Sequence, residues 1–293
     1  MLLAEFIKAS VKDLEGLYPA EEAHKIILLL CESVLGTRSY THIIEPKYEI
    51  DPSRLEQLDG FVTRLCAGEP IQQIVGFSDF CGYRYKVTPD VLIPRPETEM
   101  LVRRAVEEAA RFSRPVRILD LCTGSGCIAW TLAASVPGAE VVGVDISDPA
   151  LEVARSQYIG HEIREKGMMD PVFVKADVLD TEQDFDHGVF DLIVSNPPYV
   201  MESEKASMRR NVLEYEPELA IFVPDDDPLV FYRAIARWSE RFLAPDGIAM
   251  TEINESLGKE TEEVFKASGF HHTGIVKDFF YRNRFVVYSK NSL

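Results

Sequence analysis

The sequence predicts an α/β protein in which a mostly parallel sheet, covered by helices on both faces, follows a small helical bundle and a β-hairpin linker. Three observations support this fold class. Apolar residues recur at helical spacing in the segment 1–70, residues 71–95 lose that spacing, and from Val116 onward apolar strands alternate with helical stretches. The expected domains are therefore 1–70, 71–95 and 96–293, and a chain of 293 residues is long enough for about two domains and a linker.

The N-terminal segment 1–70 is predicted to contain three main helices. The clearest begins at Asp51 and Pro52, because Asp is a good helix cap and Pro fits the first helical position. Its apolar side chains recur at helical spacing, at Leu55, Leu58, Val62 and Leu65. Earlier helices are expected over residues 2–17 and 19–35. This segment carries no catalytic constellation, so its role is either structural or the recognition of a partner.

Residues 71–95 place Gly76 and Gly82 among aromatic and β-branched residues, which predicts a β-hairpin linker. Pro96 then opens a predicted helix that runs to about Phe112.

The segment 96–293 is expected to carry the sheet. Strands are predicted at 116–121, 140–146, 172–177, 190–196, 247–253, 273–279 and 283–289. Helices are predicted at about 124–135, 148–166, 227–243 and 256–268. Because the last two strands have no helix between them, we expect a closing hairpin and hence one antiparallel strand among seven.

The charge of the chain bears on its partners. The formal net charge is −17, and no run of Lys or Arg occurs. A protein that binds nucleic acid directly needs a basic surface, so we expect no direct nucleic-acid partner. A small-molecule substrate or a basic protein partner suits this charge better.

Cysteine usage and hydropathy indicate a cytoplasmic protein without metal. The five cysteines are scattered, form no CxxC pair and have no histidines clustered beside them, which argues against a structural zinc site. The longest apolar run, Ile26 to Cys31, is far shorter than the ~20 residues that span a bilayer. The N-terminus lacks the basic segment and apolar core of a signal peptide. We also expect no membrane association and a monomer.

A glycine-rich loop follows the first strand of the sheet, in the sequence LDLCTGSGC (119–127). Gly124 and Gly126 allow the backbone to approach a ligand closely where the next helix begins. Asp145 ends the second strand, where a carboxylate can accept hydrogen bonds from both hydroxyls of a ribose. Together these residues predict an adenosine-type cofactor across the carboxyl ends of the first two strands.

The loop by itself permits two cofactors. Gly124 to Ala129 satisfies the G-x-G-x-x-[GA] dinucleotide pattern, so NAD is one alternative. The spacing Asp120-x-Cys122-x-Gly124-x-Gly126 also resembles the first motif of S-adenosylmethionine-dependent methyltransferases, whose loop holds the methionine portion of the cofactor. Cys122 replaces the usual first glycine, which costs little if its backbone needs no positive φ.

The sequence Asn-Pro-Pro-Tyr ends the fourth strand at residues 196–199 and faces the same crevice. Asn196 can offer its side-chain carbonyl, and Pro198 constrains Pro197 to an extended conformation that aims a second carbonyl at the same point. Two such acceptors can hold both N–H bonds of a planar NH₂ group and stabilise the positive charge that grows on its nitrogen during methyl transfer. Tyr199 can pack against the planar group. A NAD dehydrogenase has no evident use for this arrangement, so S-adenosylmethionine is preferred.

Six motifs extend this pattern along nearly the whole chain. They are PIQQIVG (70–76), VLIPRPETE (91–99), ILDLCTGSGCIA (118–129), VVGVDIS (141–147), DLIVSNPPYV (191–200) and EYEPELAIF (214–222). In order and spacing they resemble the HemK/PrmC family, peptide chain release factor glutamine methyltransferases. The resemblance implies a Rossmann-like S-adenosylmethionine-dependent methyltransferase domain, an N-terminal helical domain that helps to bind release factors, and methylation of the glutamine side-chain amide in their Gly-Gly-Gln motif.

The resemblance also implies roles for individual residues. The cofactor-binding residues are expected to be Asp120, Cys122, Thr123, Gly124, Ser125, Gly126, Asp145, Asp177, Val178 and Asn196. The substrate-binding residues are expected to be Asn196, Pro197, Pro198 and Tyr199, of which Asn196, Pro197 and Tyr199 form the catalytic set. Asp177 and Val178 would lie at the adenine ring, although Asp177 can alternatively cap a helix.

Three residues depart from the family pattern: Gln73 stands where a tyrosine is usual, Tyr281 where a glycine is usual, and Val178 where some members have an aromatic residue. These departures concern the linker, the last hairpin and the stacking of adenine, and leave the reaction unaffected.

The motif VLIPRPETE supports two interpretations. Arg95 and Glu97 can touch the substrate or close over the cofactor, or Pro96 simply starts a helix whose positive end Glu97 and Glu99 favour.

Other functions fit the sequence less well. A ribosomal-protein glutamine methyltransferase shares the core motif, but the N-terminal motifs argue mildly against it. Adenine-amino DNA methylation is disfavoured by the net charge of −17. A NAD-dependent dehydrogenase or a non-enzymatic nucleotide-binding module would leave Asn196 to Tyr199 without a role.

Overall fold

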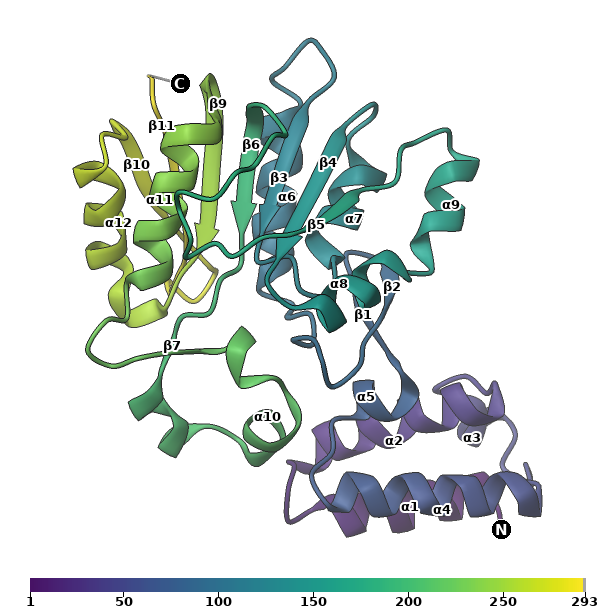
Figure 1. The fold of residues 1–293 in the computed structure, drawn as a ribbon. Helices are drawn as coiled ribbons and strands as arrows, with labels where there is room; N and C mark the ends of the chain where they lie inside the picture. Colours follow the sequence, from purple (N-terminus) through teal and green to yellow (C-terminus); the bar gives the residue numbers. More distant parts are fainter. Residues whose placement is uncertain (292–293) are drawn as a thin grey trace. The chain divides into compact units, whose positions relative to one another are not determined.

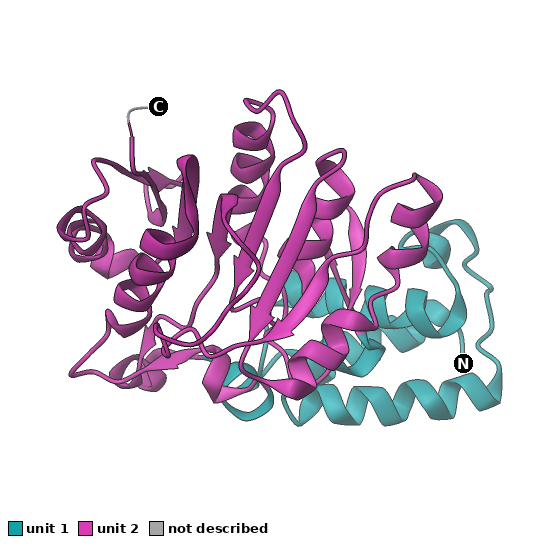
Figure 2. Cartoon of the chain, turned by 45° about the horizontal axis from the view of Figure 1, so that its top comes forward, with its two compact units in different colours: residues 1–76, 209–215 teal, residues 77–208, 216–293 magenta. Residues whose placement is uncertain are grey.

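The structure is a computed structural model that describes residues 1–291. The chain divides into two compact units, which Figure 2 draws in different colours. Unit 1 comprises residues 1–76 and 209–215, and unit 2 comprises residues 77–208 and the chain from Glu216 onward. The last two residues of the expected range 96–293 lie outside the described residues. Within the described chain, no helix is long and apolar enough to cross a bilayer.

Unit 1 is a helical bundle. Its helices are α1 (Leu3–Leu14), α2 (Ala20–Leu35), α3 (Thr41–Ile44), α4 (Pro52–Cys66), α5 (Ile71–Val75) and α10 (Arg210–Tyr215) (Figure 1). Helix α4 begins as predicted, because the Asp51 carboxylate accepts a hydrogen bond from the backbone nitrogen of Ser53 at 2.9 Å. Phe6, Ile27 and Leu58 from three of these helices lie in one core. The helical spacing of the N-terminal sequence therefore reflects the packing of this bundle.

The segment 209–215 belongs to this unit although it lies far along the sequence. Gln73 donates a hydrogen bond from Nε2 to the carbonyl of Tyr215 at 2.7 Å, and the Tyr215 hydroxyl donates to the carbonyl of Ala67 at 3.2 Å. Gln73, one of the departures from the family pattern, thus anchors the inserted segment to the bundle.

A hairpin opens unit 2 within the predicted segment 71–95, but the first residues of that segment, Ile71–Val75, form helix α5 of unit 1. Strands β1 (Phe77–Phe80) and β2 (Tyr83–Lys86) pair antiparallel and are joined by two residues. Both of these residues, Cys81 and Gly82, have positive φ, at 49° and 80°. This is the backbone pattern of a type I′ turn, whose twist matches that of the two strands.

The core of unit 2 is a seven-stranded sheet in the order β10-β11-β9-β6-β3-β4-β5 (Figure 1). Its strands are β3 (Arg117–Leu121), β4 (Glu140–Asp145), β5 (Val172–Lys175), β6 (Phe190–Ser195), β9 (Leu243–Glu252), β10 (His272–Lys277) and β11 (Asn283–Ser289). Strand β11 runs antiparallel to both neighbours, and the pairs from β9 to β5 are parallel. The predicted seven strands with one antiparallel strand are confirmed.

Helices cover both faces of this sheet. They are α6 (Thr98–Ala109), α7 (Cys127–Ser135), α8 (Asp148–Arg155), α9 (Ile159–Glu165), α11 (Val230–Phe242) and α12 (Gly258–Ala267). Successive strand residues alternate between two cores: Ile118 and Val141 pack with α6 and α7, whereas Leu119 and Val142 pack with α11 and α12. Burial on both faces explains why the strands read as continuous apolar runs.

Two predicted helices need correction. The stretch 148–166 forms two helices, α8 and α9, instead of one. Gln157 lies between them, and its Nε2 donates hydrogen bonds to the carbonyls of Lys86 and Ser125 at 3.0 and 2.8 Å, which favours a break in the helix at this residue. The helix expected from Pro96 begins at Thr98, after a turn.

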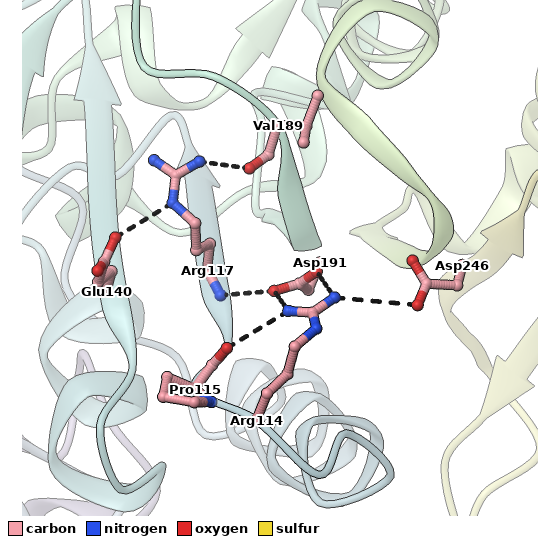
Figure 3. Close-up of polar contacts among 7 residues, drawn as sticks. All are labelled: Arg114, Pro115, Arg117, Glu140, Val189, Asp191 and Asp246. Atoms are coloured by element: carbon pink, nitrogen blue, oxygen red, sulfur yellow. Dashed lines mark hydrogen bonds and ion pairs between the residues drawn. The ribbon is translucent and has the colours of Figure 1, made fainter.

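A cluster of ion pairs holds the amino ends of the central strands (Figure 3). Arg114 donates two hydrogen bonds to the Asp191 carboxylate at 2.7 and 2.6 Å, and the backbone nitrogen of Arg117 donates a third at 2.8 Å. The Arg117 guanidinium contacts Glu140 at 3.1 Å and the carbonyl of Val189 at 2.6 Å. Burial alone would raise the pKa of Asp191, but the hydrogen bonds from Arg114 and Arg117 outweigh it and lower that pKa. Asp191 therefore joins β6 to β3 as a charged group.

Asp191→Asn should lower the free energy of unfolding at pH 7 by about 2 kcal/mol, because it weakens charge-assisted hydrogen bonds to a buried group. Since the folded-state pKa is depressed, the stabilisation is present above the unfolded pKa of about 3.9 and is lost as pH falls through the folded value. Urea unfolding of the unsubstituted protein and of Asp191→Asn between pH 7 and pH 3 measures how the difference in their free energies of unfolding shrinks as pH falls. Asp246, an exposed residue 3.9 Å from Arg114, provides the control, and an equal loss in Asp246→Asn would contradict the assignment.

Candidate active site

A pocket of about 1080 Å³, including its open mouth, lies in unit 2 at the carboxyl ends of the parallel strands. Its lining contains nine predicted site residues, namely Cys122, Thr123, Gly124, Ser125, Asp145, Asp177, Val178, Asn196 and Pro198. The other predicted residues, Asp120, Gly126, Pro197 and Tyr199, are not part of the lining. The structure thus brings together residues from four strand ends in one pocket, the place where open α/β sheets bind ligands.

The glycine loop bends sharply between β3 and α7. Gly126 has a φ of 77° immediately before α7, and a Cβ at this position would lie 3.0 Å from Ala154. Gly124 has a φ of 53°, and its backbone nitrogen donates to Oδ2 of Asp145 at 2.8 Å. Both glycines are therefore required by the backbone conformation, and the loop is tied directly to the end of β4.

Cys122 departs from the sequence expectation. Its φ is 61°, so the condition under which cysteine would cost little in place of glycine is not met. A residue with a side chain in this left-handed region costs roughly 1–2 kcal/mol. Burial raises the pKa of the Cys122 thiol well above its ordinary value, so this strained residue is an uncharged thiol at neutral pH.

Asp145 is held by backbone on both sides. Its Oδ2 accepts from Gly124, and its Oδ1 accepts from the backbone nitrogen of Ser147 at 3.0 Å. Burial raises its pKa, and these hydrogen bonds oppose the rise. Because each carboxylate oxygen can accept more than one hydrogen bond, Asp145 keeps capacity for two ligand hydroxyls while its orientation is fixed.

Asp120 supports the loop from below. It is fully buried on β3, and its Oδ2 accepts a hydrogen bond from the Thr123 hydroxyl at 2.5 Å. Burial raises the pKa of Asp120 to about 7, against the hydrogen bond from Thr123. The sequence predicts that Asp120 binds the cofactor, and in the structure its side chain contacts Thr123 of the glycine loop.

Asp177 and Val178 line the pocket beyond β5. Oδ1 of Asp177 accepts from the backbone nitrogen of Leu179 at 2.9 Å, so this side chain caps a local turn as well as lining the pocket. The carbonyl of Val178 accepts from Nε1 of Trp238 at 3.0 Å. The structure places no helix in the described residues 176–189 between β5 and β6, so the helix-cap alternative is wrong, whereas a role for Asp177 at the adenine stays a prediction.

The Asn-Pro-Pro-Tyr segment leaves β6 at the rim of this pocket. Nδ2 of Asn196 donates to Oγ1 of Thr98 at 3.3 Å, and the Tyr199 hydroxyl donates to Oε1 of Glu252 at 3.0 Å. The backbone nitrogen of Tyr199 donates to the carbonyl of Ile221 at 3.2 Å. The chain then continues into the short parallel pair β7 (Val200–Met201) and β8 (Phe222–Val223). Both ends of the segment are thus fixed, and Asn196 directs its amide oxygen away from Thr98.

Arg95, whose role the sequence left open, lines the pocket and pairs with Glu216 at 2.5 Å. Glu216 is buried and also accepts from the backbone nitrogen of Ile93 at 2.9 Å. Glu97 is exposed, and Glu99 accepts from the backbone nitrogen of Cys81 at 2.9 Å. Arg95 and Glu216 therefore bind two pocket loops together, whereas Glu99 ties α6 to the hairpin.

Sequence reasoning missed three residues of this site: Thr98, Glu216 and Glu252. Glu252 ends the fifth predicted strand, and an acidic residue at the carboxyl end of a buried parallel strand was the signal that could have found it. Thr98 and Glu216 lie within two of the recognised motifs but carry no distinguishing local pattern.

The lining supplies polar groups that suit binding and positioning. It contains no histidine or lysine, and residues 1–291 contain no group of three or more His, Cys, Asp or Glu side chains placed to hold a metal. The carboxylate of Asp145, the backbone of the glycine loop and the amide of Asn196 can instead hold an adenosine-type ligand beside a planar polar group.

Comparisons with known proteins agree with this arrangement. A family profile described as a methyltransferase domain matches residues 113–275, and one described as the PrmC N-terminal domain matches residues 5–76. The chain is 38% identical to a release factor glutamine methyltransferase of Bacteroides thetaiotaomicron, over 96% of this chain and 97% of the relative. It is 37% identical to a protein of the same name from Flavobacterium psychrophilum, over 98% of both chains.

Among solved structures, the fold is similar to that of the human methyltransferase 10 domain containing protein, with a TM-score of 0.50 and 15% identity over 72% of this chain and 90% of that protein. At this level of identity the similarity concerns the fold alone.

Proposed function

The chain belongs to the release factor glutamine methyltransferase family, and we propose that Asn196 and Pro197 hold the side-chain amide of the glutamine that it methylates. The enzyme is a protein-(glutamine-N5) methyltransferase that uses S-adenosylmethionine. The observation that supports the proposed roles is the position of Asn196, which lines the pocket while its amide nitrogen is engaged by Thr98, leaving its oxygen for a ligand.

The pocket residues fit the cofactor. Asp145 retains acceptor capacity for the two ribose hydroxyls, and the backbone of Cys122 to Gly126 would contact the methionine portion. Asp177 and Val178 would contact the adenine ring. The aliphatic side chain of Val178 offers packing without aromatic stacking. When bound, the cofactor supplies an electrophilic methyl group on a positively charged sulfur.

The protein's contribution to catalysis is to orient the amide nitrogen. An amide lone pair is delocalised and attacks poorly. The carbonyls of Asn196 and Pro197 would accept both N–H bonds of the glutamine NH₂ group, favour a pyramidal nitrogen and aim its lone pair along the line of attack. Their dipoles would also stabilise the positive charge that develops on nitrogen. Because the nitrogen becomes cationic and strongly acidic as the N–CH₃ bond forms, we propose that it releases its proton to water without a dedicated strong base.

The glutamine of the Gly-Gly-Gln motif in release factors is the proposed methylation site. A ribosomal-protein glutamine would present the same amide to Asn196, but the PrmC-type N-terminal domain favours a release factor. Adenine in DNA is disfavoured by the net charge of −17, and family membership excludes the NAD dehydrogenase alternative.

We also propose that the helical N-terminal domain, expected over residues 1–70, helps to bind the release factor, with 71–95 as linker and 96–293 as the catalytic domain. Ile43 and Ile44 are 68% and 63% exposed in this region and offer an apolar contact. The five cysteines form no disulfide, which suits the reducing cytoplasm, and a monomer without nucleic acid suits the acidic composition.

Asn196→Ala should reduce kcat by about 100-fold or more, because it removes one of two acceptors for the attacking amide. Methyl transfer from labelled S-adenosylmethionine to a purified release factor, with mass-spectrometric mapping of the methylated residue, measures this. Circular dichroism and thermal unfolding serve as controls that the fold survives, and near-normal turnover would contradict the two-acceptor mechanism.

Asp145→Ala should weaken the binding of S-adenosylmethionine by about 10-fold to 100-fold, since both ribose hydrogen bonds and the anchor of Gly124 are lost. Isothermal titration calorimetry gives the affinity directly. Unchanged affinity would contradict the proposed contact between Asp145 and the ribose.

The double substitution Ile43→Glu and Ile44→Glu should raise the KM for whole release factor by about tenfold, equivalent to about 1.4 kcal/mol, because it places charge in an apolar contact. Methylation of a short Gly-Gly-Gln peptide, which lacks the rest of the release factor, should be unchanged. Equal effects on both substrates, or on neither, would argue against a binding role for this surface.

A further inference from the structure

A buried carboxylate lies directly behind the Asn-Pro-Pro-Tyr segment. Glu252 ends β9 and is 4% exposed. Its Oε2 accepts a hydrogen bond from the Thr98 hydroxyl at 2.7 Å, and its Oε1 accepts one from the Tyr199 hydroxyl at 3.0 Å. Oγ1 of Thr98 is in turn 3.3 Å from Nδ2 of Asn196. One carboxylate therefore contacts the last residue of the segment directly and the first residue through a threonine.

The direction of these hydrogen bonds follows from the number of protons available. An ionised carboxylate can only accept, and a threonine hydroxyl has a single proton to donate. When Thr98 donates that proton to Glu252, its lone pairs face Asn196 and can only accept from it. Asn196 must then turn its NH₂ group toward Thr98. The carbonyl oxygen of the same planar amide consequently points away from Thr98, toward the pocket that Asn196 lines.

We propose that Glu252 is a positioning residue which, through Thr98, fixes the side-chain amide of Asn196 in the one orientation that presents its oxygen to the substrate amide. This inference rests on the proposed role of Asn196 in holding the glutamine. We call the two hydrogen bonds from Asn196 to Thr98 and from Thr98 to Glu252 the relay. Without the relay, the two orientations of the Asn196 amide differ little in shape. The flipped orientation would present an NH₂ donor to the substrate NH₂ group, which is itself a donor.

The second oxygen of Glu252 adds a mechanical constraint. Its hydrogen bond with Tyr199 holds the last residue of the segment. The two prolines therefore lie between residues that Glu252 contacts directly, at Tyr199, or through Thr98, at Asn196. A shift of Glu252 would therefore move Asn196 and Tyr199 together. The Thr98–Glu252 hydrogen bond is buried at the end of β9, whereas the contacts to Asn196 and Tyr199 are partly buried beside the pocket.

The relay depends on the charge of Glu252. Burial raises the pKa of Glu252, against the hydrogen bonds from Thr98 and Tyr199 and the positive charge of Arg284 on β11. The charged and titratable groups that face it are Arg284, Glu97, Tyr199 and Tyr232. Arg284 is itself paired with Asp278 at 2.8 Å. At low pH a protonated Glu252 can donate to Thr98, which reverses the relay and frees Asn196 to flip, so kcat should fall as pH drops through this raised pKa.

The test compares Glu252→Gln, Thr98→Val and Thr98→Ser. Glutamine has one acceptor end and cannot receive both hydroxyl protons, and valine removes the hydroxyl with little change in shape. Both variants should lower kcat by about 10-fold to 100-fold, the range typical of outer partners of functional groups, with cofactor affinity changed less than about twofold. Thr98→Ser retains the hydroxyl and should recover most of the turnover lost in Thr98→Val. The acid limb of the kcat profile should disappear in Glu252→Gln.

Controls separate this inference from a general loss of stability and from the proposed function. Thr131→Val is a matched control, because Thr131 is a buried threonine whose hydroxyl contacts Tyr85 and the carbonyl of Cys127 rather than Asn196. Should Glu252→Gln fail to fold, the Thr98 pair decides the matter. Loss of activity in Asn196→Ala together with normal kcat in Thr98→Val and Glu252→Gln would overturn the relay alone. Normal activity in Asn196→Ala would overturn the substrate role of Asn196 and the relay with it.

Discussion

Parallel hydrogen bonding between β4, β3, β6 and β9 is the constraint on which the site depends. Leu121 on β3 is in register with Val144 on β4 and Ser195 on β6, and Ser195 is in register with Thr251 on β9. Because these strands run the same way, the residues that follow each of them meet at one edge of the sheet. The glycine loop, Asp145, the Asn-Pro-Pro-Tyr segment and Glu252 converge for this reason, although they lie far apart in the sequence.

The pKa values of buried acids shift in opposite directions at the two ends of the parallel strands. At the amino edge, Asp191 is surrounded by donors from Arg114 and Arg117, which lower its pKa and make it a structural ion. At the carboxyl edge, burial raises the pKa of Asp120, Asp145 and Glu252. Acids whose pKa is raised by burial are common in functional sites, and here they contact the glycine loop and the Asn-Pro-Pro-Tyr segment rather than a strand junction.

Among residues 1–291, three residues other than glycine have positive φ, and two of them stand where related sequences usually have glycine. Cys122 and Tyr281 stand where glycines are usual, and both have positive φ, at 61° and 62°. The fold thus retains the glycine conformation with residues that adopt it at a cost. For Cys122 the cost falls in the cofactor loop, where the surrounding contacts of Thr123 and Gly124 hold the backbone in place.

The sequence by itself determined the class of fold, the seven strands and the positions of the glycine loop and the Asn-Pro-Pro-Tyr segment, because these features are encoded by local periodicity and by the polar residues that end apolar strands. Residues such as Asp145 and Asn196 could be found in this way. Only the tertiary structure decided which residues support them. The bond between Thr98 and Glu252 joins residues 154 positions apart, and the helix break at Gln157 arises from contacts with backbone up to 71 positions away. Such hydrogen bonds depend on strand register and packing, which no local pattern specifies. No local pattern specifies the positive φ of Cys122 either, because the geometry of its loop follows from the positions of β3, β4 and α7.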